Sequence, residues 1–391
     1  MLVSRRHFFF GSLALPAMAA TKPPVRPNVV LILVDGLPDW ALGSYGNKEV
    51  LTPNLDRLAQ MGTRFSNHFA CTPAAALSRA TILTGRTPMQ LGDAANPTVG
   101  AGSLDQILGG AGYSVHGSAV GAAGAIVDQQ APAGKPFFLT ATFPGLQPPY
   151  EGVAQKFQDL YAKTRFETLD SQPAAAANAR AGKEMLADTV GNLRKYAAAV
   201  SALDADVGAL VQKLSERRLL DHTLIVFTSS CGALLGRHGL WGAGDASEPA
   251  NMFDEVVGTP LIWAWSGRVP AQGVRPEMVS TYDFVPSVCE LAGAAMPSGN
   301  YCGRSYVLLA TGKPLPKKQP WRKTVFGHYQ ATDMARSERY KLVMHRAGKG
   351  ELYDLREDPG EKVNQYDNQQ FLTVRNSLAD GLAAWKQHYS S

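Results

Sequence analysis

The sequence predicts an α/β fold with a large, mostly parallel central sheet flanked by helices, followed by a small C-terminal α+β subdomain. Three observations predict it: apolar runs without alternation, helical segments between them, and a boundary rich in proline and lysine near residue 315. With 391 residues and 45% hydrophobic content, the chain is long enough for one large and one small domain, each with its own core.

The apolar runs indicate strands that are buried on both faces. The first, "NVVLILVDG", covers 28–36, and similar runs cover 136–143, 223–230 and 259–267. A run without period-two alternation is typical of a parallel strand covered by helices on both sides. We therefore expect these segments to form the central sheet.

Helical segments lie between the apolar runs, notably at 54–62, 104–112 and 185–219. Strands that alternate with helices favour a layered α/β domain, because each crossover helix packs back onto the sheet. We place this domain at 26–315.

A small subdomain is expected at 316–391. Its start is marked by "TGKPLPKKQPW" at 311–321, which is rich in proline and lysine. Beyond this boundary the sequence predicts short strands and turns, and then a terminal helix over 371–389.

The first twenty residues predict an export leader of the twin-arginine type. Arg5 and Arg6 precede a short apolar run that ends in the small-x-small pattern Ala17-Met18-Ala19. The run is too short to span a bilayer, and the mature chain is expected to have no membrane span. The resemblance of the leader to this type predicts a periplasmic or secreted protein.

Charge and cysteine usage exclude some classes of function. The formal net charge is +5, from 38 basic and 33 acidic residues, which is too little to suggest nucleic acid as a partner. The cysteines are Cys71, Cys231, Cys289 and Cys302, and their spacing does not settle any disulfide pairing. No C-x-x-C motif or Cys/His cluster indicates zinc.

Several polar residues follow directly after the apolar strands. Asp35, Gln147 and the pair Ser230-Cys231 all lie there. Ligands collect at the carboxyl ends of parallel strands, since loops and helix N-termini converge at that edge. We therefore expect any site to include these positions.

The chain resembles the sulfatase family, within the alkaline-phosphatase-like superfamily, over nearly its whole mature length. The resemblance implies a central sheet of the kind described above and sulfuric ester hydrolysis as the ancestral activity. It rests on the stretches "RPNVVLILVDGL", "GSYGN", "TPNLDRLAQMGTRFSN", "SRATILTGRTP", "YAAAVSALDADVGALVQKLSERRLLDHTLIVFTSS", "GRHGLWGAG", "GTPLIWAWSGRVP" and "ELYDLREDPGEKVN".

The resemblance also implies a particular chemistry. A cysteine or serine in C/S-x-P/A-x-R is oxidised to formylglycine, whose hydrate attacks sulfur, and calcium holds the sulfate oxygens. Lysine and histidine side chains neutralise charge and protonate the leaving group.

The nucleophile position of that motif is occupied by Ala75. It lies four residues before Arg79 and ten residues after Phe65, and both family spacings lead to it. Cys71 stands one helical turn too early, and Leu77 replaces the usual proline or alanine. Because an alanine methyl has no heteroatom, we expect no formylglycine.

Most residues that would bind the metal according to the resemblance are also replaced. The family's Asp-Asp after the first strand is Asp35-Gly36 here, and its later Asp-His or Asp-Asn pair is Ser230-Cys231. Calcium takes six to eight oxygen ligands, several of them charged, and one carboxylate remains. We therefore expect neither calcium nor any other cofactor.

The other catalytic positions are also replaced. Gln147 stands in a histidine position and Ala243 in a lysine position. The segment "SVHGSAVGAAGAIV" at 114–127 should carry a lysine and a histidine, but it has no lysine and its histidine, His116, comes too early. The chain from 121 to 136 is also shorter than in typical family members.

The resemblance implies that only Asp35 and Arg79 are retained from the family's polar centre, while His238 matches a common family position whose role is less direct. Arg79 either binds a sulfate or phosphate or ties the nucleophile loop together through hydrogen bonds. The resemblance implies that Asp35 occupies a former metal-ligand position. We expect it to act as a capping or hydrogen-bonding carboxylate, with a role as a ligand as the alternative. His238, in "GRHGLWG", is either a loop histidine or a catalytic acid.

Three hypotheses follow for the function. The first is an exported, catalytically inactive member of the family that binds an anionic or sulfated glycan or small ester. The second is an active hydrolase with a relocated nucleophile, Cys71, Ser78 or Cys231. The third is an interaction protein that uses another surface, with the old pocket filled by Leu77 and Gln147.

Overall fold

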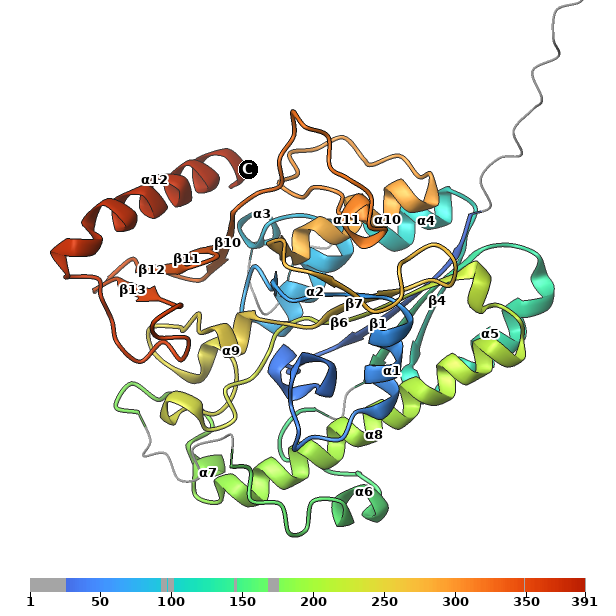
Figure 1. Ribbon diagram of the computed structural model, residues 1–391, viewed down its shortest axis with the longest axis horizontal. Coiled ribbons are helices and arrows are strands. Elements are labelled where there is room, and N and C mark those ends of the chain that lie inside the picture. The colour runs from blue at the N-terminus through green and yellow to red at the C-terminus, as the bar shows by residue number, and fades with distance from the viewer. Residues whose placement is uncertain are drawn as a thin grey trace, which may run out of the picture.

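The computed structural model describes residues 26–92, 97, 102–143, 146–167, 176–347 and 349–390. Its centre is a seven-stranded sheet, and a separate four-stranded sheet follows at the C-terminal end (Figure 1). The predicted leader at 1–20 lies outside the described residues. Within the described ranges, no helix is long and apolar enough to cross a membrane.

The seven strands of the main sheet run in the order β4-β5-β1-β6-β7-β2-β8. The first four of these strands are mutually parallel. Their bounds, with those of the other three, are β4 Ser114–Ala119, β5 Phe137–Phe143, β1 Asn28–Val34, β6 Thr223–Ser229, β7 Leu261–Ala264, β2 Thr63–Phe65 and β8 Gly273–Arg275.

The predicted apolar runs form the middle of this sheet, and β1 is buried along its full length. The run at 259–267 supplies β7, but β7 pairs antiparallel to β6, which corrects the expectation of a parallel strand. An unbroken apolar run indicates that a strand is buried on both faces, and all of β7 is buried. It does not indicate whether the strand is parallel or antiparallel to its neighbour. Strand direction depends instead on the connection.

One face of the sheet is covered by α1 Pro53–Met61, α5 Ala123–Gln130 and α8 Thr189–Glu216 (Figure 1). Val30, Ile32 and Val34 of β1 point into this layer. The long helix α8 buries residues at alternating spacings of three and four, which is the pattern of an amphipathic helix. These residues are Leu193, Tyr196, Val200, Leu203, Val207, Leu210 and Leu214.

The segment predicted as one helix over 185–219 is divided in the structure. The short helix α7 spans Lys183–Leu186, and α8 begins only at Thr189. Asp188 precedes α8, and its carboxylate accepts a hydrogen bond from Gly191 N at 2.9 Å. Such a cap satisfies a free N–H of the first turn and so starts a new helix.

The opposite face is covered by α2 Ala75–Thr84, α4 Leu104–Gly110, α10 Phe284–Ala292 and α11 Val307–Ala310. Val29, Leu31 and Leu33 of β1 point into this second layer. Alternate side chains of one strand therefore enter two separate cores, as the unbroken apolar pattern requires. Three further short elements are α3 Pro88–Leu91, α6 Gln155–Asp159 and a parallel pair of strands, β3 His68–Phe69 with β9 Val279–Ser280.

The C-terminal part forms the predicted small α+β subdomain. Four antiparallel strands, in chain order, are covered by the terminal helix α12, Leu372–Tyr389 (Figure 1). Leu382 and Trp385 of the helix pack on Ala335, Leu342 and Leu352 of the strands. The strands are β10 Thr324–Tyr329, β11 Thr332–Ser337, β12 Tyr340–His345 and β13 Glu351–Asp354.

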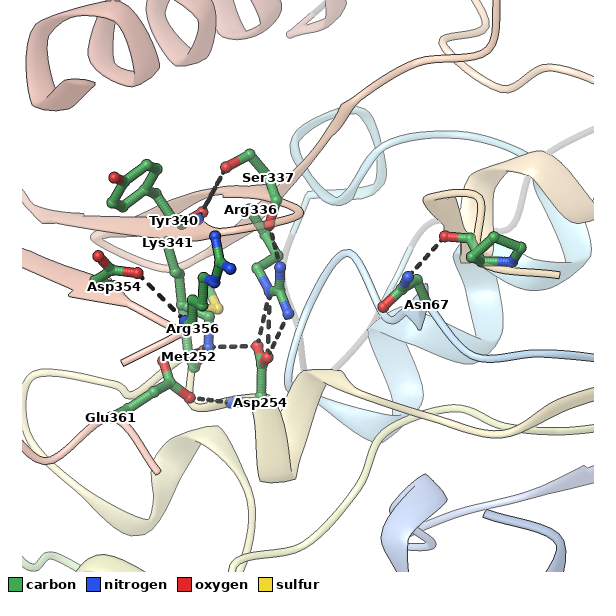
Figure 2. Close-up of polar contacts among 11 residues, drawn as sticks. Asn67, Met252, Asp254, Arg336, Ser337, Tyr340, Lys341, Asp354, Arg356 and Glu361 are labelled. Atoms are coloured by element: carbon green, nitrogen blue, oxygen red, sulfur yellow. Dashed lines mark hydrogen bonds and ion pairs between the residues drawn. The ribbon is translucent and has the colours of Figure 1, made fainter. Parts of the chain in front are cut away.

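A buried group of charges joins this subdomain to α9, Asp254–Val257, of the main domain (Figure 2). Lys341 of β12 lies with its Nζ 2.6 Å from both Asp254 Oδ1 and Glu361 Oε1. Arg336 of β11 pairs with Asp254 at 2.9 Å between Nη2 and Oδ2. The lysine side chain is fully buried, so these contacts replace its hydration.

Candidate functional site

A cavity of about 720 Å³ lies at the carboxyl ends of β1, β5 and β6. Gly36, Gln147 and Cys231, which follow these strands, all line it. Tyr196 of α8 fixes the end of β1, since its hydroxyl donates to the Gly36 carbonyl at 2.9 Å. The same edge is held by Ser230 N, which donates to Val34 O at 2.8 Å.

Ala75 is the first residue of α2, and its methyl borders the cavity. The residue before the helix, Ala74, is extended and its side chain makes no capping bond, because alanine has no acceptor. The first N–H groups of α2 therefore have no side-chain cap, and the residues of this first turn border the cavity. Cys71 lies outside the lining and is fully buried, with its N–H donated to Thr281 Oγ1 at 3.2 Å.

Asp35, Arg79 and Ser230 form one hydrogen-bonded group next to the cavity. Arg79 reaches back from α2 and makes an ion pair with Asp35. The other carboxylate oxygen of Asp35 accepts a bond from Ser230 Oγ at 2.5 Å. Both oxygens of the carboxylate are therefore engaged by protein groups, and the guanidinium supplies the positive charge that balances it.

The remaining predicted positions divide between the cavity and its surroundings. Ala243 borders the cavity, whereas His238 is not among the lining residues. The His238 ring stacks on Phe253 with centroids 3.7 Å apart, and its Nε2 lies 3.2 Å from Glu255 Oε2. His116 lies on β4 and is also absent from the lining. The His238 side chain therefore contacts Phe253 and Glu255 and does not border the cavity.

One wall of the cavity comes from the C-terminal subdomain. His328 and Gln330, at the end of β10, are lining residues. His328 Nδ1 lies 2.6 Å from Asp333 Oδ1, and Lys386 of α12 pairs with the same carboxylate. Burial opposes the charge of Asp333, but the bonds from His328 and Lys386 hold the pKa of its carboxyl below the usual range.

Comparison with known proteins identifies the family. A family model described as Sulfatase matches residues 27–122 and 118–294. The chain belongs to the sulfatase family. A second model, described as the C-terminal part of N-sulphoglucosamine sulphohydrolase, matches residues 248–388.

Individual sulfatases are similar over most of their length. Arylsulfatase A of Bos taurus is 28% identical over 460 residues, which covers 91% of this chain and 86% of that protein. The N-acetylglucosamine-6-O-sulfatase of Bacteroides thetaiotaomicron is 23% identical, covering 97% and 89%. A solved protein in complex with its substrate D-glucosamine-2-N,6-O-disulfate superposes with a TM-score of 0.79 at 21% identity, covering 93% and 98%.

The family resemblance assigns calcium binding to the positions of Asp35, Gly36, Ser230 and Cys231, and the residues present there do not fit this ion. Asp35 is already bound by Arg79 and Ser230, and Gly36 has no side chain. Gln147 Nε2 lies 3.5 Å from where a Cβ on Gly36 would be, so an amide donor borders this space. Among the described residues, no group of three or more His, Cys, Asp or Glu could hold a metal ion.

The thiols of this sulfatase-family chain are all free. Burial, followed by the charge of Asp35, raises the pKa of the Cys231 thiol to about 12. Burial raises the pKa of Cys71 to about 11. Since the thiolate is the nucleophilic form, neither sulfur is activated at neutral pH. Ser78 is also fully buried within α2.

Two lining features were not anticipated from the sequence. His328 lies in a segment interpreted only as short strands, and it reaches the cavity because the subdomain packs on residues near Cys71. The Cys71 carbonyl accepts a hydrogen bond from His328 N at 2.8 Å. Tyr150 and Trp241 also line the cavity, with the indole N–H donated to the tyrosine oxygen at 3.2 Å. No local motif marks such long-range contacts.

Proposed function

We propose that this chain is an exported, catalytically inactive member of the sulfatase family that binds an anionic or sulfated glycan or small ester in the cavity. The main support for inactivity is that Ala75 occupies the position of the family's nucleophile. This residue borders the cavity at the first turn of α2. No oxidation of an alanine methyl gives formylglycine, so the residue that attacks sulfur is missing.

The absence of the other catalytic groups supports inactivity. Asp35 is bound by Arg79 and Ser230, while Gln147 and Ala243 border the cavity with side chains that carry no charge and are not acids. Groups of one catalytic site act as a unit, and the loss of the nucleophile alone costs several orders of magnitude in rate. The joint loss supports a site that no longer turns over sulfate esters.

The shape of the site supports binding over a filled pocket. The cavity is open to about 720 Å³, the Gln147 side chain is exposed, and Leu77 forms part of the wall. The uncapped first turn of α2 offers backbone donors and a partial positive charge to an anion. Relatives named for arylsulfatase and N-acetylglucosamine-6-O-sulfatase activity supply the ligand class. These observations disfavour the interaction protein with a plugged pocket.

The alternative, a hydrolase with a relocated nucleophile, has less support. Cys231 lines the cavity, but its thiol is buried and its pKa is about 12. Cys71 and Ser78 are fully buried and lie outside the lining. A nucleophile needs access to the ester and a base within hydrogen-bond reach. None of the three combines both.

The purified protein is expected to hydrolyse 4-nitrophenyl sulfate and 4-nitrophenyl phosphate no faster than a matched blank, because it lacks a nucleophile and a cation for the ester oxygens. The measurement is nitrophenolate release over many hours at pH 5–9, with an active arylsulfatase as the positive control. A clear rate that disappears in Cys231→Ala or Cys71→Ala would establish the relocated nucleophile instead. Peptide mass over residues 71–79 would then show whether Cys71 carries formylglycine.

Calcium is expected to leave the stability nearly unchanged. A single carboxylate binds calcium no better than roughly millimolar, so about 1 mM calcium adds at most about 0.4 kcal/mol. A site of normal affinity, saturated a hundredfold, would add about 2.7 kcal/mol. Thermal unfolding with calcium and with chelator distinguishes the two. A rise of several degrees with calcium that is lost in Asp35→Ala would show that Asp35 anchors a metal.

A further inference from the structure

Two basic groups lie at the cavity, and they differ in how their charge is balanced. Among the described lining residues, His328 is the one whose side chain can carry a positive charge. Arg79 lies beside the cavity with its side chain 39% exposed, and it makes an ion pair with Asp35. The guanidinium and this carboxylate together carry no net charge. Arg79 can still donate a hydrogen bond to a ligand, but the pair adds little net positive charge to the site.

The group around His328 has a different charge balance. Asp333 of β11 lies opposite His328 of β10, and its Oδ1 is 2.6 Å from His328 Nδ1. Lys386 of α12 pairs with Oδ2 of the same carboxylate. The lysine therefore already balances the negative charge of Asp333. When His328 is protonated, the group holds two positive charges and one negative charge, and its net positive charge lies on the cavity wall.

The contact with Asp333 also decides which nitrogen of His328 carries hydrogen. The bonds from His328 and Lys386 hold the pKa of the Asp333 carboxyl below its usual range, so this group is a carboxylate, which only accepts hydrogen bonds. Nδ1 must therefore carry the hydrogen of the neutral ring. Among the described residues, Nε2 has no hydrogen-bond partner. A neutral ring presents a lone pair at Nε2, which repels an anion, whereas a protonated ring presents an N–H, which binds one.

We propose that His328 recognises the anionic group of the ligand, by donating a hydrogen bond from Nε2 of its protonated ring to a sulfate oxygen. Where the ring of the free protein is neutral, binding takes up one proton from solvent, which adds to Nε2. Asp333 and Lys386 act as positioning residues, since they fix the ring and balance each other's charge. This inference rests on the proposed function, because it names the residue that selects an anion in the inactive site.

The other charged groups at the cavity act on this proton in opposite directions. The exposed carboxylate of Asp245, on the cavity wall, favours a protonated His328. Lys386 and Arg79 disfavour it, although each is paired with a carboxylate. Burial raises the pKa values of two further lining groups and so keeps them uncharged at neutral pH: Tyr150 and Cys231.

The test is titration calorimetry of the full chain with 4-nitrophenyl N-acetyl-β-D-glucosaminide 6-sulfate and with its unsulfated form, at pH 5.5 and pH 8.5. A sulfate monoester keeps its charge over this range, so any pH dependence comes from the protein. The Kd of the sulfated form should rise at least about tenfold from pH 5.5 to pH 8.5, whereas that of the unsulfated form should not change. Buffers that differ in ionisation enthalpy should reveal uptake of about one proton per bound sulfated ligand at pH 8.5.

Two variants separate the charge of His328 from its place in the structure. His328→Gln keeps a donor for Asp333 but cannot be charged, so it should weaken the sulfated form about tenfold at pH 5.5 and abolish the proton uptake. His328→Lys supplies a permanent charge and should bind the sulfated form with nearly the same Kd at both pH values. His222→Gln changes an exposed histidine away from the cavity and should behave like the wild type. Circular dichroism and the urea midpoint check that each variant is folded.

The possible failures of the two proposals differ. If the Kd of the sulfated form does not depend on pH, or if His328→Gln still takes up a proton, the role of His328 is wrong while the proposed function stands. The anion would then be held by Arg79 or by the first turn of α2. If the sulfated form does not bind at millimolar concentration at pH 5.5, both proposals are wrong.

Discussion

Replacing Lys341 with methionine is expected to lower the free energy of unfolding by about 3–5 kcal/mol, the usual cost of removing one partner from a buried ion pair. The ammonium group lies 2.6 Å from a carboxylate oxygen of Asp254 and of Glu361, and it donates to the Met252 carbonyl at 2.8 Å (Figure 2). Because methionine fills a similar volume to lysine, the decrease in the free energy of unfolding can be attributed to the lost positive charge. Urea unfolding measures it.

The two carboxyl groups that contact Lys341 have pKa values shifted in opposite directions. Burial opposes the charge of Asp254, but Lys341 and Arg336 hold the pKa of its carboxyl far below the usual range. Burial raises the pKa of Glu361 above its usual range despite Lys341, and the charge of Asp254 adds to the rise. A carboxyl group whose pKa is higher in the folded than in the unfolded protein stabilises the fold fully at pH values below its unfolded pKa. This stabilisation is lost as the pH rises through the folded pKa. Glu361 is therefore the carboxyl that takes up a proton most readily when the lysine is removed.

Two further variants test the explanation. Lys349→Ala removes an exposed lysine from its pair with Asp367 and should change the free energy of unfolding by less than about 0.5 kcal/mol. Glu361→Gln combined with Lys341→Met should recover part of the loss, because one buried charge is removed with its partner. A loss of less than 1 kcal/mol in Lys341→Met alone would contradict the role given to this charge group.

The parts of the fold that could be predicted from sequence are those fixed by burial on both faces. β1, β5 and β6 were recognised to within two residues because each is a long apolar run. Neither β2 nor β8 was recognised, since three residues carry no periodicity. The direction of β7 depends on the path of the chain between β6 and β7, which an apolar pattern does not record.

Some residues of the site could likewise be predicted from local sequence, whereas others are brought to it only by long-range contacts. Residue spacing placed Ala75, Gln147 and Cys231 at strand and helix ends, and the structure gathers them around one cavity. The sequence left open whether Arg79 binds an anion or ties the nucleophile loop together, and it did not indicate the ion pair that Arg79 makes with Asp35. His328 lies more than 250 residues after Ala75 in the sequence, so only packing of the subdomain brings it to the same wall.

Restoring the nucleophile motif alone, by Ala75→Cys with Leu77→Pro, is expected to leave hydrolysis of 4-nitrophenyl sulfate at the level of the blank. Residue 77 lies in the first turn of α2, where an N–H has no partner within the helix, so proline is tolerated there. The substituted residue still lacks a cation, because Arg79 occupies Asp35, and it lacks an acid for the leaving group at Gln147 and Ala243.

The kcat/KM of this variant is expected to lie far below that of an active arylsulfatase. Loss of one group that stabilises developing charge costs about 10²–10³ in rate, and loss of a general acid costs about 10²–10⁴. Both are missing, so kcat/KM should remain at least about 10⁴-fold below that of an active arylsulfatase assayed beside it. Peptide mass must first show whether the substituted residue carries the aldehyde, in a preparation coexpressed with a formylglycine-generating enzyme. If a converted variant came within a hundredfold of the active enzyme, the argument that Asp35 is unavailable to a cation would be wrong, and Asp35 would have to exchange Arg79 for a cation during turnover.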